Sequence, residues 1–142
     1  MNNRKVSNLW KHEQFTIEKN SLSFLKELNL DNNKLLFFPQ LGNYNFIVED
    51  LSLRYNQIAY IPEGELYPST LKFLYLDKNP IKNPEVIFKE GNKLEELYLC
   101  ETGLKQIPAN TRLNNLQKLN LGNNPFDFSS FKAENFPNVL HL

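Results

Sequence analysis

Residues 25–35 read LKELNLDNNKL, and the same eleven-position pattern returns four times along the 142-residue chain. The later copies are VEDLSLRYNQI (48–58), LKFLYLDKNPI (71–81), LEELYLCETGL (94–104) and LQKLNLGNNPF (116–126). They start 23, 23, 23 and 22 residues after the start of the preceding copy. A fixed period of this size indicates a repeat architecture, in which each unit stacks on the one before it.

Each copy carries apolar side chains at its fourth and sixth positions, such as Leu28 and Leu30 in the first copy. Residues two apart in a strand project from the same face, so each copy offers a short strand with one apolar face. One such face cannot bury itself alone, but stacked copies bury one another. We therefore expect one short strand per copy and a continuous core behind the strands.

The pattern resembles that of the leucine-rich repeat family, L-x-x-L-x-L-x-x-N-x-L, and only Thr102 departs from its asparagine position. The resemblance covers roughly residues 25–142. It implies an α/β fold, a curved solenoid with a parallel β-sheet on the concave face and short helical or extended segments on the convex side. We accordingly predict an N-terminal cap (1–24) and five repeats of about 23 residues (25–138).

The last four residues, 139–142, admit two interpretations. They are either the start of a sixth repeat or a short terminal strand that is itself the cap. Both leave one sheet edge open, and open edges pair with other chains unless they are blocked. We expect this C-terminal edge to meet a partner, which could be a second copy of the chain or a further domain.

An asparagine at the ninth position of four copies is the exception within an otherwise apolar pattern. A buried polar side chain costs free energy unless its hydrogen bonds are made. We predict a ladder in which each asparagine bonds the backbone of its own turn and of its neighbour. Its members are Asn33, Asn56, Asn79 and Asn124, and Thr102 supplies only part of a rung.

Composition excludes several classes of partner. The 16 Lys and Arg balance 16 Asp and Glu, so the chain lacks the basic excess that non-specific nucleic-acid binding needs. The longest apolar runs, such as 35–38, fall far short of the roughly 18 residues of a membrane-spanning helix.

A single cysteine and no signal-peptide pattern favour a reducing compartment. We expect a cytoplasmic protein, or one translocated into a host cell without a cleaved signal peptide.

The sequence shows little that predicts catalysis. His12 and His141 lie at opposite ends of an elongated molecule, and the glycines form no phosphate-binding loop. A zinc site lacks ligands. Cys100 has acidic neighbours, Glu96 and Glu101, which disfavour the reactive thiolate. We therefore expect no enzymatic activity, no cofactor and no metal.

The surface of the predicted sheet carries the candidate binding residues. Aromatic residues and arginine gather in the middle copies, and these types are enriched at protein-binding hot spots. The alternative is that Tyr75 and Tyr98 only pack across neighbouring strands. Acidic residues outnumber basic ones here six to three, which favours a partner with a basic and apolar surface. The candidates are Asp50, Arg54, Tyr55, Phe73, Tyr75, Asp77, Glu96, Tyr98 and Glu101.

The resemblance implies a recognition module that binds another protein with its concave face. Small, cysteine-poor proteins of this family include bacterial effectors that bind or block host or companion proteins. An alternative is a targeting fragment of a larger enzyme, with the catalytic part beyond Leu142. A third hypothesis is a structural solenoid that assembles with itself through the open sheet edge.

Overall fold

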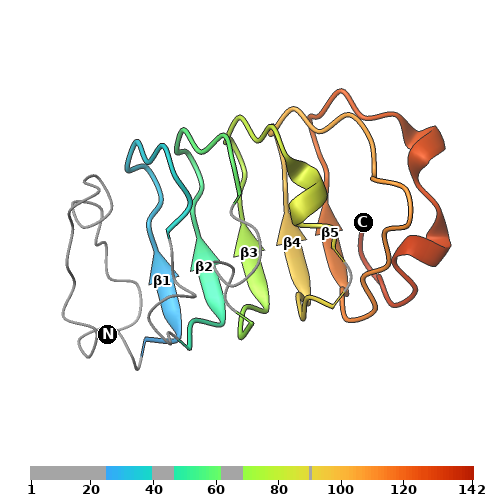
Figure 1. Cartoon of the computed structure of the whole chain (residues 1–142), viewed down its shortest axis with the longest axis horizontal. Helices are drawn as coiled ribbons and strands as arrows, with labels where there is room; N and C mark the ends of the chain where they lie inside the picture. Colours follow the sequence, from blue (N-terminus) through green and yellow to red (C-terminus); the bar gives the residue numbers. More distant parts are fainter. Residues whose placement is uncertain (1–24, 40–46, 62–68, 90) are drawn as a thin grey trace.

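The computed structural model describes residues 25–39, 47–61, 69–89 and 91–142. The predicted N-terminal cap (1–24) lies outside these residues. Five short strands form one parallel sheet whose order follows the chain (Figure 1). They are β1 (Glu27–Asn29), β2 (Asp50–Ser52), β3 (Phe73–Tyr75), β4 (Glu96–Tyr98) and β5 (Lys118–Asn120). The prediction of one short strand in each copy is confirmed.

The strands pair in a register that follows the sequence period. The central residue of each strand is the fourth-position leucine, and each of these leucines lies beside the next. They form one buried row, with exposed fractions of 2% or less: Leu28, Leu51, Leu74, Leu97 and Leu119. A period of 23 residues therefore equals one full turn of the solenoid, so that equivalent positions meet across the sheet.

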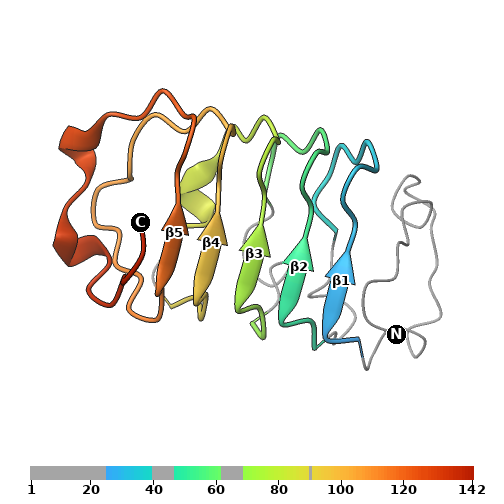
Figure 2. The ribbon, with the colours of Figure 1, turned by 180° about the vertical axis from the view of Figure 1, so that it is seen from behind.

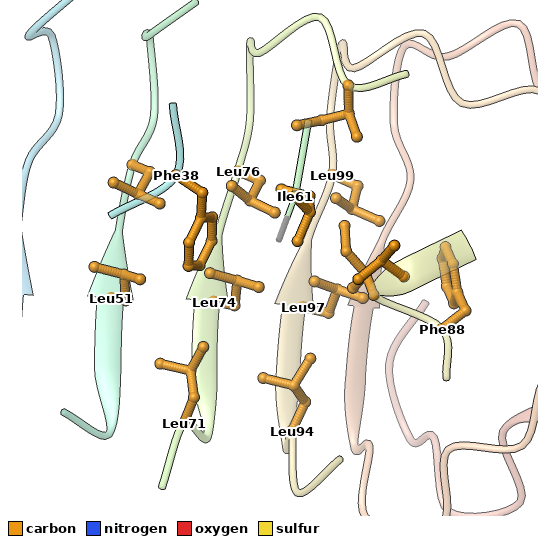
Figure 3. Close-up of a cluster of buried hydrophobic side chains, with 14 of the residues drawn as sticks. Phe38, Leu51, Ile61, Leu71, Leu74, Leu76, Phe88, Leu94, Leu97 and Leu99 are labelled. Carbon is orange, nitrogen blue, oxygen red and sulfur yellow. The ribbon is translucent and has the colours of Figure 1, made fainter. Parts of the chain in front are cut away.

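The core lies between the sheet and the returning segments. Figure 3 shows Leu74, Leu97 and their neighbours in a cluster with side chains from the returning segments, among them Phe38, Ile61 and Phe88. Burial of one such side chain contributes about 1.5–3 kcal/mol, so the core supplies most of the stabilisation. Because every copy adds the same leucines, the core is continuous along the stack.

The returning segments are extended or form short 3₁₀ helices. These are η4 (Pro84–Val86), η5 (Phe128–Ser130) and η6 (Ala133–Asn135). No α-helix occurs in the described ranges. The molecule is a curved leucine-rich solenoid of the predicted kind, with the sheet on the concave side.

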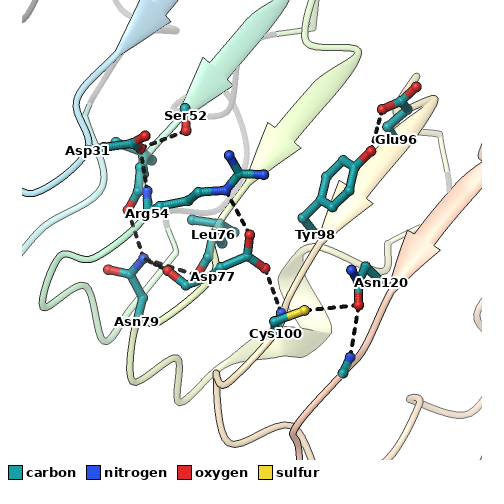
Figure 4. Close-up of polar contacts among 12 residues, drawn as sticks. Asp31, Ser52, Arg54, Leu76, Asp77, Asn79, Glu96, Tyr98, Cys100 and Asn120 are labelled. Atoms are coloured by element: carbon teal, nitrogen blue, oxygen red, sulfur yellow. Dashed lines mark hydrogen bonds and ion pairs between the residues drawn. The ribbon is translucent and has the colours of Figure 1, made fainter.

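The asparagine ladder is confirmed for Asn56, Asn79 and Asn124, whereas the buried side-chain amide nitrogen of Asn33 has no hydrogen-bond partner among the described residues. The Asn56 side chain accepts from the backbone N–H groups of Asn33 and Leu35 and donates to the carbonyls of Leu30 and Leu53. Asn79 makes equivalent bonds with its own turn and the preceding one (Figure 4). Asn124 does so too. Thr102, as expected, supplies only part of a rung: its hydroxyl donates to Leu99 O at 2.9 Å.

The C-terminal residues lie along the far edge of the sheet, and the two opposite views both place the C-terminus beside β5 (Figures 1 and 2). His141 forms a parallel bridge with Lys118, and its carbonyl accepts from the Leu119 N–H at 3.0 Å. Leu140 and Leu142 are exposed. Residues 139–142 thus continue the parallel pairing by one bridge, and self-association through this edge stays a prediction.

Candidate functional site on the concave face

The concave face is built of rows that run across the strands. Side chains next to the buried leucine in each strand point away from the core, and the register aligns them between copies. The third-position row consists of Glu27, Asp50, Phe73, Glu96 and Lys118. The fifth-position row consists of Asn29, Ser52, Tyr75, Tyr98 and Asn120.

Two tyrosines and an arginine form the centre of this face. The rings of Tyr75 and Tyr98 stack across β3 and β4, with centroids 4.6 Å apart and planes 11° apart. The Arg54 guanidinium lies 4.4 Å from the Tyr75 ring centre and 5.7 Å from that of Tyr98. A cation–π contact between arginine and an aromatic ring is favourable by about 0.5–2 kcal/mol, depending on solvent exposure. We call Arg54, Tyr75, Asp77, Glu96 and Tyr98 the Arg54 cluster.

Asp77 fixes the orientation of Arg54. Its Oδ2 accepts from the Arg54 Nε at 2.8 Å, while its Oδ1 accepts from the Cys100 backbone N–H at 2.7 Å (Figure 4). The Asp77 side chain is only 15% exposed. Asp77 was predicted as a partner contact, and the structure adds a second role, since one carboxylate bonds both the preceding and the following copy.

Asp31, two copies earlier, makes a similar link to the copy that follows it. Its Oδ1 accepts from the Arg54 backbone N–H at 2.7 Å and from the Ser52 hydroxyl at 2.6 Å. Ser52 is consequently buried, although its fifth-position place predicts an outward side chain. The seventh-position carboxylates of Asp31 and Asp77 thus tie successive copies together just beyond the strands.

Glu96 is engaged on two sides. It accepts a hydrogen bond from the Tyr98 hydroxyl at 2.7 Å and pairs with Lys118 at 3.3 Å. Burial, and then the hydrogen bond to Glu96, raise the pKa of Tyr98 above its usual range. Burial, followed by the charges of Asp50 and Glu96, also raises the pKa of Tyr75. Both tyrosines therefore remain neutral phenols at any physiological pH.

The family comparison agrees with this geometry. A family model described as Leucine Rich Repeat matches residues 24–44 and 115–139. The chain is a leucine-rich repeat protein. No solved structure matches it.

This leucine-rich repeat protein also resembles a curated plant protein, "Protein phosphatase 1 regulatory inhibitor subunit PPP1R7 homolog" from Arabidopsis thaliana. The two are 32% identical over 125 residues, which cover 85% of this chain and 38% of the relative. The chain thus spans well under half the relative's length. Repeats of this family and a relative named as a regulatory subunit suggest a protein-interaction module.

The eighth-position residues of this leucine-rich repeat protein form an outer row with unusual backbone geometry. All five have a left-handed φ, between 52° and 59°. Asparagine tolerates this conformation, but a bulky side chain is strained in it. The row holds Asn32, Tyr55, Lys78, Glu101 and Asn123, and Lys78 contacts both the Tyr55 ring, at 5.3 Å, and Glu101, at 3.1 Å.

Replacing Tyr55 with asparagine should stabilise the fold. The strain of a non-glycine residue at φ 57° costs about 1–3 kcal/mol, whereas an exposed contact with Lys78 contributes about 0.5–1 kcal/mol. We expect a net gain of about 0.5 kcal/mol in urea unfolding. Tyr60→Asn is the control, because Tyr60 is also exposed and lies 5.9 Å from Lys82 but has no left-handed φ. An equal or greater gain in the control would contradict the strain argument.

The structure brings most predicted site residues of the leucine-rich repeat protein together. Arg54, Tyr75, Asp77, Glu96 and Tyr98 contact one another as the Arg54 cluster. The other four predicted residues lie around it: Asp50 and Phe73 in the third-position row, and Tyr55 and Glu101 in the outer row.

Sequence reasoning missed the contribution of Asp31, Lys78 and Lys118 to this site. Asp31 accepts a hydrogen bond from the Arg54 backbone. Lys78 pairs with Glu101, and Lys118 pairs with Glu96. The available signal was the period itself. Residues 23 apart lie side by side, which puts Arg54 between Asp31 and Asp77.

Metal ligands and the thiol of Cys100 are the reactive groups to consider on this face. Within the described ranges, no group of three His, Cys, Asp or Glu residues could hold a metal ion. Cys100 is half-buried, and burial followed by the charge of Asp77 raises its pKa, so the thiol is protonated. Its Sγ donates to Asn120 Oδ1 at 2.9 Å. In the same part of the chain, no helix is long and apolar enough to cross a membrane.

Proposed function

We propose that this leucine-rich repeat protein is a non-enzymatic interaction module that binds a partner protein through its concave face. The observation that carries the proposal is the Arg54 cluster. Its arginine is bound by Asp77 and lies 4.4 Å and 5.7 Å from the ring centres of the stacked Tyr75 and Tyr98. Binding costs less free energy when the contact residues are already ordered, and tyrosine and arginine are the typical anchors of such interfaces.

The charges around the cluster favour a partner with a basic and apolar contact surface. The concave rows contain more acidic than basic residues, and the Tyr98 and Tyr75 rings provide the apolar centre. Complementary charges steer association and exclude wrong partners more than they add affinity. We propose that the partner sets a basic rim around an apolar side chain.

The relative supports a regulatory form of this function. It is named as a regulatory inhibitor subunit of a protein phosphatase, and a phosphatase catalytic subunit is therefore one candidate partner to test. The single cysteine supports a further proposal, a cytoplasmic location. The resemblance to small, cysteine-poor members of the family suggests another, a role as a bacterial effector that binds or blocks a host or companion protein.

The test is capture of a partner from native or host cell extract, followed by titration. The double variant Tyr75→Ala/Tyr98→Ala should weaken binding at least about tenfold, because it removes both rings of the cluster. Tyr60→Ala is the matched control, since it removes an exposed tyrosine of the returning segment. Circular dichroism checks that both variants fold. Unchanged affinity in the folded double variant would place the interface elsewhere.

A further inference from the structure

The third-position row contains two carboxylates, those of Glu27 and Asp50, that have no counter-ion within the described part of the chain. Three other acidic side chains of this face have one: Asp77 pairs with Arg54, Glu96 with Lys118 and Glu101 with Lys78. Within the described ranges, no hydrogen bond or ion pair engages the Asp50 carboxylate. It is nonetheless half-buried on the concave side of β2.

The neighbours of Asp50 in the row add negative charge around its carboxylate. Glu27 lies beside it on β1, and Glu96 lies one strand further along, beyond Phe73 on β3. Parallel strands are about 4.8 Å apart, so Asp50 and Glu96 flank Phe73 at about 10 Å from each other. Burial, followed by the charges of Glu27 and Glu96, raises the pKa of Asp50.

The nearest cations do not form an ion pair with Asp50. The Arg54 side chain is bound through Nε to Asp77 and lies over Tyr75, and Lys118 is paired with Glu96. Phe73 offers an aromatic side chain beside Asp50 on the neighbouring strand β3. An ammonium or guanidinium group is attracted both by carboxylates and by the face of an aromatic ring.

We propose that the concave sheet face binds a Lys or Arg side chain of the partner protein at Asp50, between Glu27 on β1 and Phe73 on β3. This inference rests on the proposed function and specifies the chemistry of its contact. The carboxylates supply the charge complementarity, and Phe73 excludes water on one side. The Arg54 cluster, one row away, then contacts the apolar part of the same partner segment.

The first experiment uses an octa-arginine peptide as the probe, with an octa-glutamate peptide as the opposite-charge comparison. Asp50→Asn should weaken octa-arginine binding at least about fivefold at physiological salt, because it removes the unpaired charge. Glu134→Gln removes an equal charge from an exposed position on η6, away from the sheet. It should change the affinity less than about twofold. Equal losses in the two variants, or none in Asp50→Asn, would overturn the proposal.

A second readout excludes a folding defect. The pKa of Asp50 is higher in the folded than in the unfolded state, so its ionisation opposes folding, and stability falls as the pH rises through that pKa. Asp50→Asn should therefore raise the Tm at neutral pH and lose this gain near about pH 3, where the carboxyl is protonated in both states. The groups that act on Asp50 are Glu27, Glu96 and Arg54. A lower Tm at neutral pH would contradict this assignment of the carboxylate.

The captured partner separates this inference from the proposed function. If the double tyrosine variant loses the partner but Asp50→Asn keeps full affinity, the concave interface stands and the cation site is wrong. If the double variant keeps the partner, the proposed function itself is wrong. Loss in both variants, with normal binding by Glu134→Gln, is the result that we expect.

Discussion

Replacing Asn79 with leucine should lower the free energy of unfolding by at least about 3 kcal/mol, although leucine has nearly the same size and is apolar. Asn79 is 1% exposed and sits between the second and third copies. Its amide donates to the carbonyls of Leu53 and Leu76 and accepts from the Ile58 N–H. Each buried backbone group left without a partner costs about 1–3 kcal/mol, which exceeds the gain from burying a leucine there.

Urea unfolding, followed by circular dichroism, measures this effect. Asn115→Leu is the matched control, since Asn115 is an exposed asparagine in a turn of the same solenoid. The control should change stability by less than about 0.5 kcal/mol. If the two variants were equally stable, the ladder would not be what joins the copies, and the ninth-position asparagines would need another explanation.

The strands and the ladder were predictable because both follow from burial and spacing. Leucines two apart define one strand face, and a 23-residue period leaves only one way to bring Leu51, Leu74 and Leu97 into a single core. Polar residues at a regular spacing inside that core are tolerated only if their side chains bond the backbone, as those of Asn56 and Asn79 do.

The Arg54 cluster was only partly predictable. Placing aromatic and charged residues on the concave face required no more than strand alternation. Whether the rings stack, or which carboxylate holds the arginine, depends on side-chain rotamers and on the twist beyond the strand ends. Tyr75 and Tyr98 can both pack across the strands and bind a partner. Their rings stack on each other, and Arg54 lies over the Tyr75 ring.

Some features lie beyond the periodic pattern. Ser52 occupies an outward position but is buried, because Asp31 of the preceding copy accepts its hydrogen bond. The left-handed backbone at Tyr55 follows from the turn geometry after each strand, not from the preference of tyrosine. Both departures from the pattern have the same origin. The backbone conformation repeats from copy to copy, but the side chains at equivalent positions differ.

Replacing Asp77 with alanine should destabilise the fold by about 2 kcal/mol and release Arg54. The variant leaves the Cys100 backbone N–H without its acceptor at 2.7 Å and removes the ion pair with the Arg54 Nε. Hydrogen bonds to charged groups contribute about 1.5–3 kcal/mol, whereas a partly exposed ion pair adds at most about 1 kcal/mol. The backbone bond therefore dominates stability, and the ion pair determines where the guanidinium lies.

Asp77→Asn separates the two roles of this carboxylate. Its amide oxygen can still accept from the Cys100 N–H, so most of the stability should be retained, whereas the charge that orients Arg54 is lost. NMR detects this orientation directly, because the Arg54 Nε–H should exchange slowly in the parent protein and quickly in both variants. Partner affinity should then fall in Asp77→Asn without a matching loss of stability. Full affinity, together with a rapidly exchanging Nε–H, would mean that the partner itself orders Arg54 and that preorganisation contributes nothing to binding.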